Sequence, residues 1–219
     1  TIKPREGRGE FVPGSNRPRR YDAAVTNPDF DEARSALARA RAEFETRLAL
    51  VGDDDWDLPT PCEGWSVRDL TGHLVGGGRM SEMLLSGAEK DDALQRLFAL
   101  EITGDPKDAF RDATDAQAAA FDAPGAGDAL CHHPMRDMPG SEFIWMRIRD
   151  TTVHAWDLAR ALGADDTLDP ELVATLWTQV EPLAPFLGAS GMFGTGASGE
   201  LSEAATTQQR LLDALGRRP

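Results

Sequence analysis

Two residues four positions apart, Asp150 and His154, are the clearest candidates for chemistry in this sequence. They fall in RIRDTTVHAWDLA, and a spacing of four on a helix places both side chains on one face, one turn apart. An interior carboxylate beside a histidine is costly unless it is ion-paired or bound to a metal. The spacing therefore indicates either a pair of metal ligands or a simple hydrogen-bonded or solvated pair.

A third ligand can come from His73, which lies in a different predicted helix on an otherwise apolar face. An Asp/His/His set leaves coordination positions open for water and substrate, as catalytic zinc sites do. A histidine in such a setting can equally be a core residue satisfied by ordinary hydrogen bonds. The residues alone leave both interpretations open.

Two residues near these candidates also have two interpretations each. Asp157 lies about one turn beyond His154, where it can accept a hydrogen bond that orients the histidine. The alternative is a surface carboxylate paired with Arg160. Cys62 precedes a predicted helix start, whose dipole favours a thiolate, but packing within a Pro-rich loop is the simpler interpretation.

The tripeptide Cys131-His132-His133 offers three potential metal ligands in succession. Neighbours in a loop need not converge on one ion, so we expect substrate-loop or surface residues instead of a second metal cluster. His133 is the candidate for proton transfer, because histidine titrates near neutral pH. The tryptophans are expected in the core or the wall of a pocket. They are Trp56, Trp65, Trp145, Trp156 and Trp177.

The elements that must position these residues are predicted to be helices, because apolar residues recur at spacings of three and four. Capping residues support several of the starts, and Gly163 is predicted to close the helix that carries Asp150. No segment shows convincing strand alternation. The predicted helices cover 29–51, a segment beginning after Ser66, 90–102, 106–121, 141–162, 170–184 and a short C-terminal stretch.

These elements predict an all-α bundle with additional short helices and a long irregular connection, 122–140, before the helix that carries Asp150. Gly76, Gly77 and Gly78 interrupt the helix that carries His73 and would cost an isolated helix about 1 kcal/mol each. That helix is expected either to stop there or to let another group approach closely.

Composition excludes several classes of protein. The 219 residues carry a net charge of −14, which argues against a nucleic-acid binder, and no apolar run is long enough to span a bilayer. Two cysteines cannot form a disulfide framework, and no secretory signal is evident, so we expect a cytoplasmic protein. Residues 1–28, rich in Pro, Gly and Arg, are expected to be a basic arm outside a domain at 29–219.

Two motifs together resemble a known family. WDLPTPCEGWSVRDLTGHLVGG (56–77) and RIRDTTVHAWDLARALG (147–163) are similar to the DinB-like metal-binding bundles. The closer resemblance is to an actinobacterial branch related to the mycothiol-dependent maleylpyruvate isomerase N-terminal domain. The ending, MFGTG followed by QQRLLDALGRRP, resembles the same branch, so the similarity covers about residues 30–219.

The resemblance implies a four-helix bundle that binds a divalent metal, usually Zn²⁺, through His73, Asp150 and His154. The family generally has Glu where this chain has Asp150, and Asp is one methylene shorter. Either direct ligation or a bridging water is consistent with that difference. The resemblance does not extend to a separate C-terminal domain of the isomerase, so it does not imply that enzyme's substrate.

The function implied by the resemblance is that of a metal-dependent enzyme acting on a small molecule, as a transferase or isomerase that uses mycothiol or another low-molecular-weight thiol. One alternative is a metal-dependent hydrolase or cyclase that uses no thiol. Another is a non-catalytic, metal-binding regulatory module. The expected partners are small molecules, with neither nucleic acid nor membrane, and the oligomeric state, a dimer included, is left open.

Overall fold

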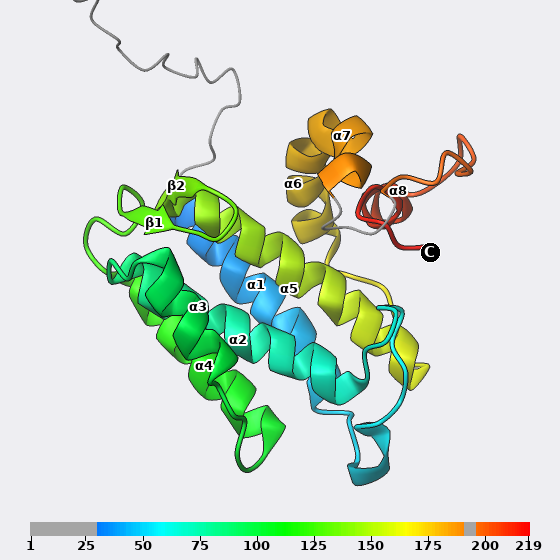
Figure 1. Cartoon of the computed structure of the whole chain (residues 1–219). Coiled ribbons are helices and arrows are strands. Elements are labelled where there is room, and N and C mark those ends of the chain that lie inside the picture. Colours follow the sequence, from blue (N-terminus) through cyan, green and yellow to red (C-terminus); the bar gives the residue numbers. More distant parts are fainter. Residues whose placement is uncertain (1–29, 191–195) are drawn as a thin grey trace, which may run out of the picture.

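Four long helices form the body of the protein in the computed structural model, which describes residues 30–190 and 196–219. The expected arm at 1–28 lies outside the described residues. In the body, α1 packs against α4 and α5, and α2 packs against the same two helices (Figure 1). This arrangement confirms the predicted all-α four-helix bundle. The four helices are α1 (Phe30–Leu48), α2 (Val67–Leu85), α4 (Pro106–Asp122) and α5 (Gly140–Leu162).

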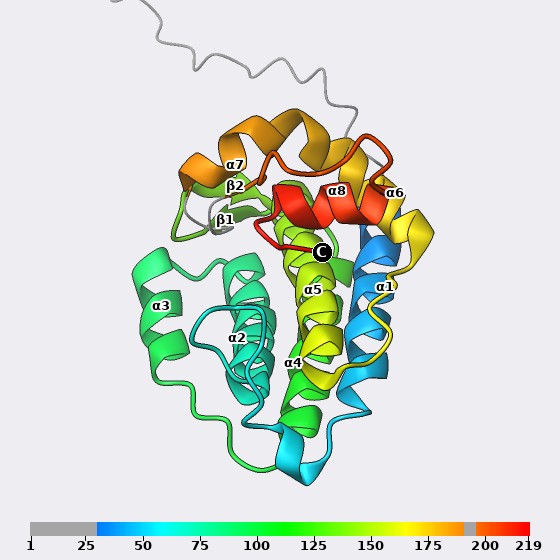
Figure 2. The same ribbon diagram turned by 90° about the vertical axis from the view of Figure 1, so that its right-hand side faces the viewer.

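Shorter helices lie outside this body. The helix α3 (Lys90–Phe98) runs beside α2, whereas the helices after α5 gather on one side of the bundle, where α6 (Pro170–Val180) contacts α1 (Figure 1 and Figure 2). The predicted helix over 170–184 is divided by a 3-10 turn at Glu181–Leu183, where Pro182 lacks the backbone N–H that a continuous helix needs. The helices on this side are α6, α7 (Ala184–Ser190) and α8 (Thr207–Ala214).

The helix boundaries follow the capping residues. Ser66 accepts a hydrogen bond from the Asp69 N–H, and the Asp69 carboxylate accepts one from the Ser66 N–H, which forms a capping box at the start of α2. The Asp105 and Asp169 side chains accept hydrogen bonds from backbone N–H groups at the starts of α4 and α6, and each is followed by a proline. Gly163, in the left-handed conformation at φ 62°, ends α5 as predicted.

The connection 122–140 was expected to be irregular, but it contains a hairpin. The strand β1 (Leu130–His132) pairs antiparallel with β2 (Asp137–Pro139). Three residues are too few for a recognisable alternation in the sequence. The hairpin nevertheless buries its central residues, Cys131 and Met138, and turns their neighbours outward. Two other predicted helices were too long, since α1 ends at Leu48 and α3 at Phe98.

The run of glycines does not stop α2, and each glycine admits a different neighbour. A Cβ atom on Gly76 would lie 2.9 Å from a methyl group of Leu97 on α3. On Gly77 it would lie 2.3 Å from the guanidinium of Arg147 on α5, and on Gly78 2.8 Å from a backbone oxygen of α4. The glycines therefore let three other helices approach α2 closely. This confirms the second of the two expectations, that another group comes close to the helix at the glycines.

The core runs through all four long helices and includes a close contact of the Phe44 and Phe110 rings, 4.7 Å apart. In the described part of the chain, no helix is both long and apolar enough to cross a membrane. Three of the tryptophans (Trp56, Trp145 and Trp156) are buried in this core, whereas Trp65 and Trp177 are partly buried against it.

Candidate metal centre

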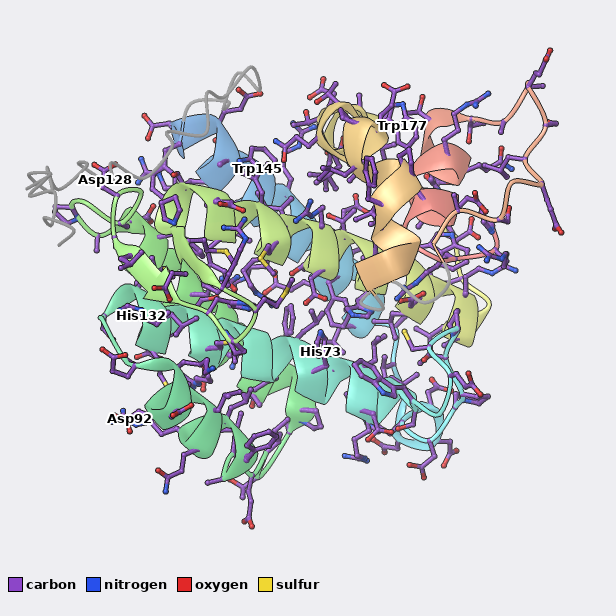
Figure 3. The ribbon with its side chains drawn as sticks, turned by 45° about the horizontal axis from the view of Figure 1, so that its top comes forward. His73, Asp92, Asp128, His132, Trp145 and Trp177 are labelled. Atoms are coloured by element: carbon purple, nitrogen blue, oxygen red, sulfur yellow. The ribbon has the colours of Figure 1, made fainter. Side chains whose placement is uncertain are left out.

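The fold brings His73, Asp150 and His154 together, although His73 lies on α2 and the other two on α5. The His73 Nε2 atom is 3.1 Å from both carboxylate oxygens of Asp150, and the His154 Nε2 atom is 3.3 Å from Oδ1 of Asp150. The imidazole rings meet edge to face, with centroids 5.0 Å apart. Figure 3 shows His73 between its own helix and α5. The two motifs that are separate in sequence thus form one cluster.

These separations fit a divalent ion. Zinc binds nitrogen and oxygen at about 2.0–2.2 Å, so two ligands of a tetrahedral site are about 3.4 Å apart. The two distances from imidazole nitrogen to carboxylate are close to that value, and one ligand atom of each residue lies within 4.8 Å of the others. The geometry is therefore compatible with direct ligation by Asp150 despite its short side chain. That the three residues bind a metal remains a prediction.

A buried hydrogen-bond network holds Asp150. The Arg147 guanidinium donates to Oδ2 of Asp150 at 2.7 Å and to the side-chain oxygen of Gln117 at 3.0 Å, and Ser81 donates to the same Gln117 oxygen. Burial alone would raise the pKa of Asp150, but the charges of His154 and Arg147 hold it well below its ordinary value. Asp150 is therefore a carboxylate, and Oδ1 is the oxygen not engaged by Arg147.

A second buried network holds His154. The Asp157 carboxylate is fully buried and lies 2.9 Å from the His154 Nδ1 atom, and the Arg217 guanidinium binds both carboxylate oxygens, at 3.1 and 2.6 Å. With the Nδ1 proton directed to Asp157, the Nε2 atom that faces Asp150 is the nitrogen that a metal would bind after displacing its proton. Asp157 thus has the contact expected of an orienting acceptor. The alternative pairing with Arg160 is wrong, because Arg160 contacts Asp166 at 3.2 Å.

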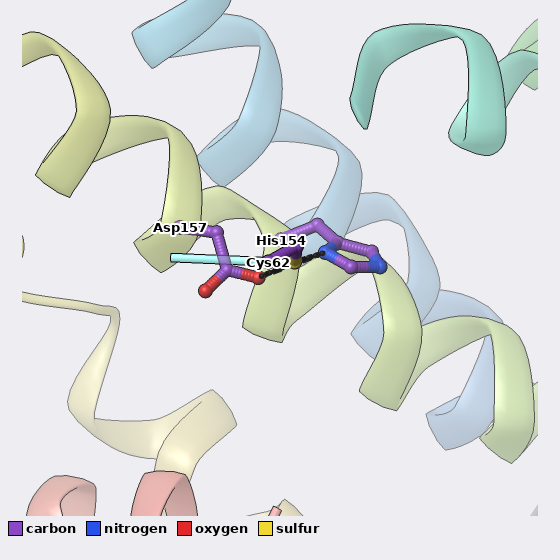
Figure 4. Close-up of side chains that lie close together, drawn as sticks. All are labelled: Cys62, His154 and Asp157. Carbon is purple, nitrogen blue, oxygen red and sulfur yellow. Dashed lines mark hydrogen bonds and ion pairs between the residues drawn. The ribbon is translucent and has the colours of Figure 1, made fainter. Parts of the chain in front are cut away.

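Cys62 lies beside Asp157, near the Nδ1 edge of the His154 ring (Figure 4). Its Sγ atom is 3.3 Å from Oδ2 of Asp157 and 3.9 Å from Nδ1 of His154, so Cys62, His154 and Asp157 also have the spacing of three metal ligands. However, Arg217 is 3.3 Å from the sulfur as well as bonded to Asp157. Arg217 thus engages both Asp157 oxygens and the sulfur, whereas Arg147 leaves Oδ1 of Asp150 unengaged, and this difference favours the set that contains His73.

The predicted ligands border a large cavity between α2, α3, α5 and the hairpin. Its volume is about 760 Å³, and His73 and Asp150 form part of its wall. Their side chains are 38% and 24% exposed, whereas that of His154 is 8% exposed, so the cluster is open on its cavity side. Gly76, Gly77 and two residues of the connection 122–140, His133 and Met135, line the same cavity.

The three neighbours Cys131, His132 and His133 point to different places. Cys131 is buried, which raises the pKa of its thiol to about 11, and His132 pairs with Asp137 at 3.0 Å near the surface. His133 lines the cavity, where burial and then the charges of Arg147 and Arg136 lower its pKa. The tripeptide does not converge on one ion, and a neutral His133 can accept a proton within the cavity.

Sequence reasoning missed two arginines. Arg147 could have been found, because it precedes Asp150 by three residues and so shares its helix face. Arg217 gave no such signal, since it lies 60 positions from Asp157 and 155 from Cys62. Its contact depends on how the C-terminal helices fold over α5.

The sequence was compared with protein families and with known proteins. Residues 37–159 match the family model described as "Mycothiol maleylpyruvate isomerase N-terminal domain". Two proteins of Mycobacterium tuberculosis, named "Uncharacterized protein Rv0738" and "Uncharacterized protein MT0763", are each 36% identical over 141 residues. Those alignments cover 63% of this chain and 71% of each relative.

The fold is also similar to solved structures. The mycothiol-dependent maleylpyruvate isomerase and a substitution mutant of the same enzyme each match with a TM-score of 0.56. Each alignment covers 69% of both chains, at 21% and 20% sequence identity respectively. At this identity the likeness concerns the fold.

Proposed function

The chain belongs to the family of the mycothiol maleylpyruvate isomerase N-terminal domain, and on that premise we propose that it is a divalent-metal-dependent enzyme that joins a low-molecular-weight thiol to a small molecule or isomerises such a molecule. Zinc is the proposed metal and mycothiol the proposed thiol. The observation that carries the proposal is the convergence of His73, Asp150 and His154 beside a cavity of about 760 Å³, whose wall includes His73 and Asp150.

The number of ligands favours an enzyme over a structural metal site. Structural zinc sites are closed by four protein ligands, whereas catalytic sites use three and leave one position open. Here the set has three members, and its exposed side faces the cavity. When bound there, a divalent ion would lower the pKa of a thiol or water at the open position and so supply a nucleophile at neutral pH.

The chain's own residues have distinct tasks in this proposal. His73, Asp150 and His154 hold the ion, Asp157 fixes the His154 tautomer, and Arg147 keeps Asp150 ionised. His133, whose pKa is lowered, is the proposed proton acceptor in the cavity. The apolar wall excludes water from bound reactants, which strengthens the electrostatic interactions inside.

The test is an activity assay on zinc-loaded protein with mycothiol and a panel of electrophiles, including aryl halides and activated alkenes. We expect conjugation or double-bond isomerisation that depends on both metal and thiol and that is lost in His154→Ala. His132→Ala is the matched control, because that histidine lies outside the cluster. Equal activity of His154→Ala and the wild-type protein would contradict the proposal, and metal-dependent activity without thiol would assign hydrolysis instead.

A further inference from the structure

One arginine in the wall of the cavity forms no ion pair with any carboxylate of residues 30–190 and 196–219. Arg149 lies on α5 beside Asp150, and its Nε atom is buried without a hydrogen-bond partner among the described residues. Burial is the main cause that lowers the pKa of Arg149, and the Asp150 charge opposes it. A guanidinium remains protonated in proteins, so this half-buried side chain is a cation whose Nε–H group is buried. A buried charge is costly unless it is paired.

The carboxylates of the wall are already engaged elsewhere. Asp69 accepts hydrogen bonds from the N–H and hydroxyl groups of Ser66, and Asp150 is held by Arg147 and the two histidines. The third arginine of the wall, Arg68, is exposed and lies over the Trp56 ring. Arg149 is therefore the wall cation whose charge is left for a ligand.

The rest of the wall is largely apolar. Uncharged side chains from α2, α3, the segment after α3, α5 and the connection 122–140 enclose the space next to Arg149. Such a surface binds a hydrocarbon body by removing it from water. The apolar lining comprises Met80, Leu97, Leu100, Ile102, Met135, Phe143 and Met146.

We propose that the cavity binds a substrate that carries a carboxylate on an apolar aliphatic or aromatic body, and that Arg149 pairs with this carboxylate. This assignment rests on the proposed function, because it takes the cavity beside the metal ligands as the substrate site. Arg149 selects the anion, whereas the apolar wall accommodates the body. The planar guanidinium can donate two parallel hydrogen bonds to a carboxylate, which a lysine cannot.

The test is calorimetric titration of the full chain with hexanoate and with hexanamide, which has the same body without the charge. Both EDTA-treated and zinc-loaded protein are titrated, so that direct binding of hexanoate to zinc is separated from binding to Arg149. We expect one hexanoate per chain, bound about tenfold or more tightly than hexanamide, as for a charge-assisted hydrogen bond. Arg149→Met should remove this difference, and Arg149→Lys should restore part of it.

Arg160→Met is the matched control, since Arg160 lies on the same helix but contacts Trp156 and Asp166 instead of the cavity. Equal affinity for hexanoate in Arg149→Met and wild type would overturn the inference. The wild-type protein alone gives a second test. If it binds hexanoate and hexanamide with equal affinity, or binds neither, the inference is also overturned. Zinc titration of the same samples tests the metal centre separately, so either idea can fail while the other stands.

Discussion

The His73 Nε2 atom lies 3.1 Å from both carboxylate oxygens of Asp150, although 77 positions separate the two residues. This contact joins α2 to α5 at the wall of the cavity, and it brings the motif at 56–77 next to the motif at 147–163. Helix packing, and not the local sequence, thus completes the three-residue cluster. The account of the metal centre depends on that contact.

Removing any of the three proposed ligands should weaken zinc binding. For His73→Ala and for Asp150→Asn we expect a loss of more than about 100-fold, since variants of residues that only orient ligands already cost 10–100-fold. Competition with a chromophoric chelator measures the affinity. His132→Ala should bind zinc like the wild-type protein, and unchanged affinity in His73→Ala would show that the ion is held elsewhere.

Arg217 should influence the metal centre without touching it. Arg217→Met leaves the buried Asp157 without its cation, so we expect a 10–100-fold loss of zinc affinity, the size usual for residues that orient a ligand. The same titration measures this loss, with Arg160→Met as the control on an exposed arginine. A loss of thermal stability with full zinc affinity would instead assign Arg217 a purely structural role.

Neighbouring glycines of α2 should behave differently on substitution. Gly78→Ala places a methyl group 2.8 Å from the backbone oxygen of Ala113, which cannot move independently, so we expect about 1–3 kcal/mol of destabilisation. Gly77→Ala places its methyl group 2.3 Å from the Arg147 guanidinium, so it should displace Arg147 from Asp150 and Gln117 and, unlike Gly78→Ala, change zinc affinity as well as lower Tm. Thermal unfolding and zinc titration of both variants test this, and a zinc affinity that stays unchanged in Gly77→Ala would contradict it.

Zinc affinity should depend on pH over a range set by His154. Burial would lower the pKa of His154, but the charge and hydrogen bond of Asp150 and the hydrogen bond of Asp157 hold it well above 6.5. In metal-free protein this ring is therefore protonated near neutral pH, and zinc must displace the proton. Affinity should fall about tenfold for each pH unit below the raised pKa.

Zinc titrations in a pH series measure this dependence, and the same titrations in buffers of different ionisation enthalpy count the protons released. The decline should already be present above pH 6.5, the ordinary value for histidine. An affinity that stays constant down to pH 6.5 would show that Asp150 does not raise the pKa of His154.

Local signals in the sequence were sufficient for much of the fold. The spacing of apolar residues predicted the long helices, and capping pairs such as Ser66 and Asp69 marked where they begin. The hairpin at Leu130–Pro139 was not foreseen, because its strands are three residues long and their pairing depends on the turn between them. The interruption at Pro182 was visible in the sequence but was read as helix.

The residues of the candidate site also differ in whether the local sequence predicts their proximity. His154 and Asp150 share a helix face, so their proximity follows from the helical period alone. The position of His73 opposite them required the resemblance to a family, since no local rule relates α2 to α5. Arg217 required the tertiary structure, because its contact with Asp157 spans 60 positions and depends on the packing of the C-terminal segment.

The most direct test of the central claim is a crystal structure of the zinc-loaded protein with anomalous differences measured at the zinc absorption edge. The account predicts one strong peak at about 2.0–2.2 Å from the Nε2 atoms of His73 and His154 and from an oxygen of Asp150, with its open side toward the cavity. A peak coordinated by Cys62 and Asp157, or no peak near His73, would contradict it.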